Sequence, residues 1–271
     1  MHFSERGWMW TAAALLGVCL CLSCHGPESS RWHPEGESVW LYQLSEPVTG
    51  PRDGVEVYVL DLFDTPGETV RALRQSGARV VAYFSAGSWE DWRPDAHRYP
   101  ASVLGSAYEG WPGERWVDIR NLDTLGPILQ HRLDLAVSKG FDGVDPDNVD
   151  GYANATGFPL TEQDQLRFCR WLAGEAHRRG LAIGLKNNPE QAAALAPAFD
   201  FAVSESCFAE GWCGLWRPFL NAGKPVVAIE YTDEMGEDVF LQTVCAQREE
   251  RLYPVLCRRE LDGWTLRCSG I

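Results

Sequence analysis

Short runs of apolar and aromatic residues alternate with helix-like segments along most of the chain. Within 165–179, apolar residues recur at helical spacing, and Gly180 follows where a left-handed C-cap would precede the next run. The runs predict eight strands, at 39–44, 57–60, 79–84, 115–118, 143–147, 181–185, 199–204 and 226–229. Strands that alternate with helices are typical of an α/β protein, and eight such units predict a single (β/α)8 barrel of the TIM type.

A doubly wound open sheet is the structural alternative. Its usual support would be a glycine-rich phosphate loop, but neither G-x-G-x-x-G nor G-x-x-x-x-G-K-[ST] follows a predicted strand. We therefore favour the barrel and expect no cofactor.

The N-terminus has the pattern of an export signal. Residues 8–22 carry no charge, which suits a secretory h-region and is too short for a confident membrane span. Ser23 and Cys24 follow, and this ending resembles a bacterial lipobox with Cys24 as the lipidated residue. We expect a signal peptide at 1–23, a polar tether at 24–37 and the barrel domain at 38–271. The mature protein would be an outer-membrane lipoprotein held by its lipid anchor, or, if the signal is of the plain type, simply secreted.

Six cysteines remain after Cys24, and an even count in an exported chain indicates disulfides. Cys207 and Cys213 bracket a short loop and form the first predicted pair. Cys245 and Cys268 form the second, which would fix the C-terminal tail. Cys169 and Cys257 either pair or stay as buried thiols.

Composition narrows the class of partner. The chain has 271 residues, 45% of them hydrophobic, which suits one large domain with a full core. Its formal charge of −14 would repel a phosphate backbone, so we expect no nucleic-acid partner, and a cationic partner becomes plausible. We expect a monomer.

Polar residues stand where the apolar runs end. The carboxyl ends of barrel strands meet at one mouth, so these side chains would form an acidic ring there. The strand-end residues are Gln43, Asp61, Asp64, Ser85, Glu90, Asp118, Asp145, Asp147, Asn148, Lys186, Asn187, Glu205, Glu230 and Tyr231. Asp145 and Asp147 are two apart, so in an extended segment both point to the same side.

Other chemistries have less support. Pro146 and Val149 break the calcium-loop pattern around Asp145. The chain has no H-E-x-x-H, and the six cysteines after Cys24 have no C-x-x-C spacing, so zinc lacks support. No G-x-S-x-G nucleophile elbow occurs. We therefore expect no metal site, and what remains is carboxylate chemistry in an aromatic cleft. The aromatic residues near the strand ends, of which Tyr83, Trp89 and Tyr231 are the chosen substrate contacts, suit sugar rings or cations.

Five motifs, in order, are YFSAGSWEDWRPD at 83–95, GFDGVDPDNVDGY at 140–152, GLKN at 184–187, VSESC at 203–207 and EYTD at 230–233. Together they resemble the endo-α-1,4-polygalactosaminidase family, glycoside hydrolase family 114, over residues 38–268. The resemblance implies a (β/α)8 barrel and a polymer of α-1,4-linked galactosamine with free amines as substrate. Where the family commonly has Ser-Glu-Gln-Cys, this chain has Ser206 in place of the glutamine.

The resemblance also implies the site residues. The family uses an aspartate of an Asp-Asn pair and a later strand-end glutamate, which match Asp147 and Glu205. Glycoside hydrolysis needs a carboxylic acid and a carboxylate, and we assign Glu205 as the proton donor and Asp147 as its partner. Asn148 would orient the sugar, and Asp145 would help to keep the donor protonated. Asp61, Asp118 and Glu230 would bind ammonium groups, and Lys186 would partly neutralise the ring.

Three functions compete at this stage: an exported endo-glycosidase of galactosamine polymers, a hydrolase of a different amino-sugar exopolysaccharide, and a non-catalytic carbohydrate-binding surface lipoprotein. The presence of both Asp147 and Glu205 speaks against the third.

Overall fold

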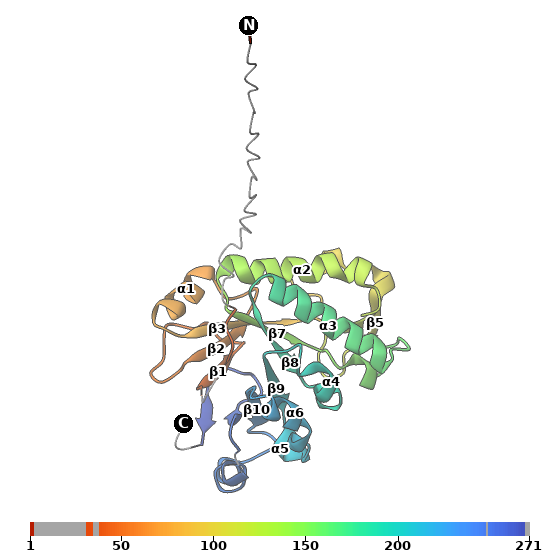
Figure 1. Cartoon of the computed structure of the whole chain (residues 1–271). Coiled ribbons are helices and arrows are strands. Elements are labelled where there is room, and N and C mark those ends of the chain that lie inside the picture. Colours follow the sequence, from red (N-terminus) through yellow and green to blue (C-terminus); the bar gives the residue numbers. More distant parts are fainter. Residues whose placement is uncertain (3–30, 35–37, 248, 269–271) are drawn as a thin grey trace.

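The computed structural model describes residues 1–2, 31–34, 38–247 and 249–268, and its core is a nine-stranded sheet (Figure 1). In spatial order the strands are β1 Trp40–Gln43, β2 Val57–Asp61, β3 Arg79–Ser85, β7 Gly143–Asp147, β8 Ala182–Lys186, β9 Phe201–Glu205, β10 Val226–Tyr231, β11 Leu252–Cys257 and β12 Thr265–Arg267. The first eight run parallel, and β12 is antiparallel to β11. The hairpin before β12 reaches β1 through the amide of Leu44, which donates to Leu261 O at 2.7 Å. The sheet thus nearly closes, and the predicted barrel is confirmed.

Helices cover the outside of the barrel (Figure 1). They are α1 Gly67–Gln75, α2 Leu122–Lys139, α3 Glu162–Arg178, α4 Ala192–Leu195, α5 Cys207–Glu210, α6 Arg217–Asn221 and α7 Glu237–Val239. The longest two carry clear start signals, because Asn121 caps α2 and a capping box between Thr161 and Asp164 begins α3. Within the described residues, no helix is both long and apolar enough to cross a membrane.

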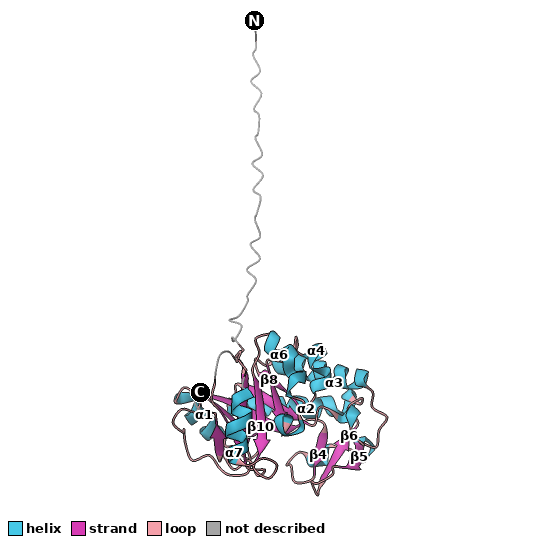
Figure 2. Ribbon diagram, turned by 90° about the horizontal axis from the view of Figure 1, so that it is seen from below, coloured by secondary structure: helices cyan, strands magenta, loops and turns pink. Residues whose placement is uncertain are grey.

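All eight predicted runs form strands, but one of them lies outside the barrel, and one barrel strand was missed. The run 115–118 belongs to β6 Glu114–Val117, in a separate antiparallel sheet with β4 Ser88–Glu90 and β5 Leu104–Ala107 (Figure 2). A parallel neighbour of β3 needs a helical crossover, and 86–114 contains no α-helix, so this segment folds back as an insert. The eighth parallel strand is β11, whose internal Pro254 hides its strand pattern.

In each barrel strand, every second side chain points inward, and these side chains fill the barrel interior. Valines such as Val59, Val81 and Val203 form its middle, and they are fully buried. At the N-terminal end of the strands, Trp32 packs on Trp40 and Phe201, with ring centroids 5.9 and 6.4 Å away. The described residues 31–34 of the predicted tether therefore lie against the bottom of the barrel.

The insert between β3 and α2 is held by a buried cation. Arg132 of α2 donates to both carboxylate oxygens of Asp95 at 2.8 Å and to Ser85 O at 2.6 Å. Its guanidinium also lies over the rings of Phe63 and Tyr99, at 5.1 and 5.6 Å from their centroids. A buried bidentate pair offsets its desolvation cost only when its remaining donors are also satisfied. Here Arg132 links α2 to the end of β3 through Ser85 and to the insert through Asp95.

Both predicted disulfides form. Cys207 is bonded to Cys213 and Cys245 to Cys268, while Cys169 and Cys257 are buried free thiols. The two bonds suit an oxidising compartment.

The two disulfides should differ in their contribution to stability. They close loops of sequence separation 6 and 23, and a longer loop loses more entropy when it is cross-linked in the unfolded chain. We expect Cys245→Ala with Cys268→Ala to lower the free energy of unfolding by about 3 kcal/mol, and Cys207→Ala with Cys213→Ala by about 2 kcal/mol. Urea unfolding of each double variant measures this, with reductant added to the wild type as the matched control. Equal losses in the two variants would contradict the loop-length argument.

Candidate active site

Three adjacent strands end on charged side chains that point into the barrel. They are Asp147 on β7, Lys186 on β8 and Glu205 on β9. The Lys186 Nζ lies 3.6 Å from Asp147 Oδ2 and 3.4 Å from Glu205 Oε2, and the lysine is only 2% exposed. A buried ammonium thus stands between two carboxylates at the mouth of the barrel. We call these three residues the charged triad.

The backbone turns sharply directly after each member of the charged triad. Asn148, Asn187 and Ser206 have φ of 61°, 42° and 57°, in the left-handed region that residues other than glycine seldom adopt. Asparagine tolerates this conformation better than most residues, whereas serine is less usual there. The turns end the strands and leave the charged side chains at their tips.

Hydrogen bonds orient both carboxylates. Tyr83 Oη donates to Asp147 Oδ2 at 2.8 Å, and the Asn148 amide donates to Asp147 Oδ1 at 2.8 Å. Tyr231 Oη donates to Glu205 Oε1, and Asn187 Nδ2 donates to Glu205 Oε2 at 2.6 Å. Both carboxylates therefore have donors on each oxygen, which fixes their orientation at the strand tips.

Within the charged triad, Lys186 and its carboxylate neighbours shift one another's pKa values. Burial alone would raise the pKa of Glu205, but the Lys186 charge and the donors Tyr231 and Asn187 hold it below its ordinary value. Burial would lower the pKa of Lys186, but Asp147, Glu205 and Asp145 raise it. Glu205 is ionised at rest, as a nucleophile or base must be. For Glu205 to donate a proton, as the sequence-based assignment requires, its contact with Lys186 has to weaken when substrate binds.

Residues 24–271 match the glycoside-hydrolase family GH114. The chain belongs to this family. It is therefore a glycoside hydrolase, and the resemblance found in the sequence is confirmed.

Solved structures and a relative agree with this assignment. The crystal structure of Aspergillus fumigatus Ega3 in complex with galactosamine superposes with a TM-score of 0.81 at 35% identity, covering 89% of this chain and 98% of that chain. The glycoside hydrolase domain of PelA from Pseudomonas aeruginosa has the same fold, with a TM-score of 0.67 at 16% identity over 85% of this chain and 98% of that chain. An uncharacterised protein of Deinococcus radiodurans is 28% identical over 238 residues, which cover 76% of this chain and 74% of that protein.

In this GH114 chain, Asp145 lies one layer below the charged triad. It is fully buried, and Tyr42 Oη donates to its Oδ2 at 3.3 Å, while its Oδ1 has no partner among the described residues. Burial raises its pKa to about 7, with Asp147 and Glu205 adding to the rise and Lys186 opposing it. The parity argument from sequence thus found a second inward carboxyl on the same strand.

The Asn148 side chain points away from the triad into the insert. Its Nδ2 donates to Ser85 Oγ, Ser88 Oγ and Glu114 Oε1 at 2.8, 2.9 and 2.9 Å. The Ser88 hydroxyl also donates to Glu114, and burial raises the pKa of Glu114 to about 7. Asn148 therefore connects the insert to Asp147, since its amide holds that carboxylate.

Three predicted ammonium-binding carboxylates have protein partners instead. Asp61 Oδ2 pairs with Arg93 Nη2 at 2.8 Å, and Asp118 pairs with Arg120 at 2.7 Å on the insert. Glu230 faces outward from β10 and accepts the first amides of α5, those of Phe208 and Ala209, at 2.9 and 3.0 Å. The acidic ring expected from the sequence is thus largely neutralised or turned outward.

Trp89 has a structural role, and three residues that contact the site were not chosen from the sequence. Trp89 donates its Nε1 to Ala96 O and packs against the outer core, which gives it a structural contact. Asn187, Glu114 and Tyr42 were not chosen as site residues although they contact the chosen ones. Asn187 could have been found, because it directly follows Lys186 in a motif at a strand end. Glu114 could not, because its contact with Asn148 depends on how the insert folds.

The raised pKa of Asp145 predicts a pH-dependent stability. In the unfolded chain this carboxyl ionises near its ordinary pKa of 3.8, but in the folded protein it keeps its proton up to about pH 7. The folded state therefore binds more protons in this window, and stability falls as pH rises through it. Asp145→Asn should remove this contribution, which is on the order of a few kcal/mol between pH 4 and pH 7.

Urea unfolding across pH 4 to 8 measures the effect, as the difference between the wild-type and variant curves. Glu109→Gln, at an exposed carboxylate of the insert, is the matched control and should run parallel to the wild type. Parallel curves for Asp145→Asn would contradict the buried proton.

Proposed function

We propose that this glycoside hydrolase is an exported endo-enzyme that cleaves α-1,4-linked galactosamine polymers, the de-N-acetylated form of an exopolysaccharide. The observation that carries the proposal is the pair Asp147 and Glu205 at the ends of β7 and β9, on either side of Lys186, each held by donors on both oxygens. The likeness to Ega3, whose crystal structure is a complex with galactosamine, supports the choice of sugar.

The chemistry follows from two carboxyl groups on either side of a glycosidic bond. One gives its proton to the leaving oxygen, while the other attacks the anomeric carbon or activates a water molecule. Glu205 is the proposed donor and Asp147 its partner. Because the Lys186 charge helps to hold the pKa of Glu205 below its ordinary value, Glu205 has to gain its proton as an incoming sugar displaces that contact.

The charge of the triad supports a substrate with free amines. Two carboxylates and one ammonium leave the triad with one net negative charge, and the chain as a whole carries −14. Two carboxylates stabilise the Lys186 ammonium, and a galactosamine ammonium would need carboxylate partners of the same kind. Tyr83, which is partly exposed beside Asp147, adds aromatic surface at the mouth, whereas Tyr231 is buried with the Arg259 guanidinium over its ring.

The two other functions make different demands. A hydrolase of another amino-sugar exopolysaccharide would use the same carboxylate pair and differ only in the sugar contacts. A carbohydrate-binding surface lipoprotein would need the cleft but not the two oriented carboxylates. Product analysis on defined galactosamine polymers separates all three.

Removal of either carboxylate should abolish hydrolysis. We expect Asp147→Asn and Glu205→Gln each to lower turnover of a deacetylated galactosamine polymer by about three orders of magnitude or more, because each removes a group that handles the proton or the anomeric carbon. Product mass analysis gives the rates. Glu237→Gln, at an exposed carboxylate of α7, is the control and should keep wild-type turnover.

Folding has to be intact for this result to count, so each variant should also keep the circular dichroism of the wild type. Wild-type turnover in either active-site variant would remove that residue from the pair.

Acetylation of the polymer should slow cleavage. Acetyl groups remove the ammonium charge and add bulk, so the rate should fall steeply as the acetyl content rises. Added salt should weaken binding of the deacetylated polymer, since screening acts over about 10 Å at 0.1 M. Rates on a series of graded acetylation, at low and high salt, measure both effects. Equal rates across the series would favour the hydrolase of another polysaccharide.

Export and anchoring are part of the same proposal. Cys24 and residues 3–23 of the signal lie outside the described residues, so the support for both is the sequence pattern together with two disulfides in the folded domain. We expect mass spectrometry of the mature N-terminus to find an acylated Cys24, and Cys24→Ser to release the protein from the membrane fraction. An unacylated N-terminus at another residue would leave the protein secreted without an anchor.

A further inference from the structure

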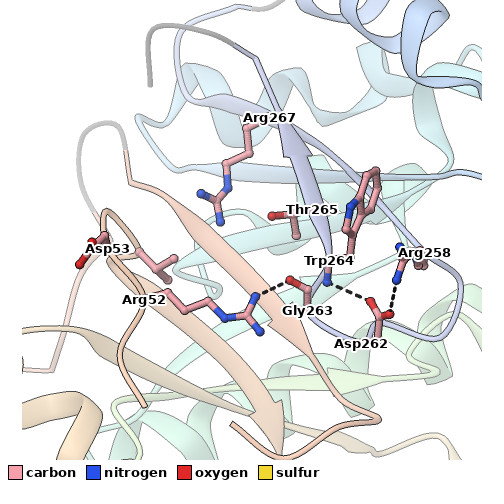
Figure 3. A pocket seen from close by; sticks show the side chains of 9 residues that line it. Arg52, Asp53, Arg258, Asp262, Gly263, Trp264, Thr265 and Arg267 are labelled. Carbon is pink, nitrogen blue, oxygen red and sulfur yellow. Dashed lines mark hydrogen bonds and ion pairs between the residues drawn. The ribbon is translucent and has the colours of Figure 1, made fainter. Parts of the chain in front are cut away.

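The barrel has one seam that helices do not cover. Among the described residues, no helix joins β1 to β2, and β11 is followed by β12 instead of a helix. These two connections flank the same seam, where Gln43 of β1 forms a bridge with Asp262. A pocket of about 500 Å³ opens there, between the loop before β2 and the hairpin that leads into β12 (Figure 3).

Three arginines line this seam pocket, and their partners differ. Arg258 Nη1 pairs with Asp262 Oδ2 at 2.8 Å, so its charge is compensated. Arg52 donates only to neutral acceptors, Gly263 O at 2.5 Å and Gln43 Oε1 at 2.8 Å. Arg267 has no carboxylate partner among the described residues, and its buried Nε has no hydrogen-bond partner there.

The uncompensated charges face a shared space. In Figure 3, Arg52 and Arg267 reach in from opposite walls with Thr265 between them, and the Asp53 carboxylate lies at the far edge, away from both guanidinium groups. Burial lowers the pKa of Arg267, and repulsion by Arg52 adds to the lowering. Two guanidinium groups that repel each other across a polar pocket are arranged to gain from an anion placed between them.

The arrangement is also pre-organised. The two hydrogen bonds of Arg52 fix its side chain against the hairpin. Arg267 directly precedes Cys268, whose disulfide with Cys245 fixes the end of β12. Because the Arg52 side chain is already held in place, it loses little conformational entropy when a ligand binds.

We propose that the seam pocket binds an oxyanion, a carboxylate or phosphate group, between Arg52 and Arg267. The site shares no lining residue with the charged triad. It would give a strongly acidic protein one place that attracts an anionic sugar or a small phosphorylated molecule, independently of hydrolysis.

Titration calorimetry on the mature protein tests the proposal, with inorganic phosphate and galacturonate as two separate probes and galactose as the neutral control. We expect one or both anions to bind, galactose not to bind, and Arg267→Gln to weaken binding about tenfold or more. Binding of phosphate alone would indicate a phosphate-bearing ligand, and binding of galacturonate alone a carboxylate sugar.

Arg71→Gln, at an exposed arginine of α1, is the matched control for loss of one positive charge and should bind as the wild type does. Arg267→Gln should keep the wild-type rate of polymer cleavage and its unfolding midpoint, which shows that the domain is intact. No binding of either anion by the wild type, or equal binding by Arg267→Gln, would overturn the proposal.

Discussion

The carboxyl-terminal end of the barrel depends on one interaction, the contact of the buried Lys186 ammonium with the carboxylates of Asp147 and Glu205. A lone ammonium buried to this extent would be strongly unfavourable, and two facing carboxylates without it would repel each other. Each charge is tolerable only because the other two are present, so the three strand tips form one electrostatic unit. The unit also keeps Glu205 ionised, because Lys186 helps to lower the pKa of that carboxyl. Asp145, buried beneath the unit, has a pKa raised to about 7 and so retains its proton below that pH.

The fold supplies the geometry for this unit through two simple rules. Parity along each strand sends Asp147, Lys186 and Glu205 into the barrel, and parallel pairing of β7, β8 and β9 brings their tips together. A left-handed residue after each tip then turns the chain away at once. Strand, register and turn therefore act on the same three positions.

Local patterns in the sequence were enough for the barrel and for the residues that parity governs. Asp145 and Asp147 were placed together for that reason. On β10 the same parity places Tyr231 inward and Glu230 outward, although the sequence analysis had put both in the ring. The sequence could not show that Asp61 pairs with Arg93, because that contact joins a strand end to the insert. The insert itself was misjudged because 115–118 has a strand pattern without the helix that a parallel neighbour requires, while Pro254 concealed β11.

The contact of Asn148 with the insert has a consequence for how such enzymes diverge. The insert touches the catalytic strand end at a few buried atoms, chiefly those of Ser88 and Glu114, and at Gly87, where a Cβ would lie 1.7 Å from the Asn148 carbonyl oxygen. Substitutions at these points would displace Asp147. The exposed rim of the same insert, which carries Trp92 and Trp111, is free of that constraint and can drift to suit new polymers while the chemistry beneath it is inherited unchanged.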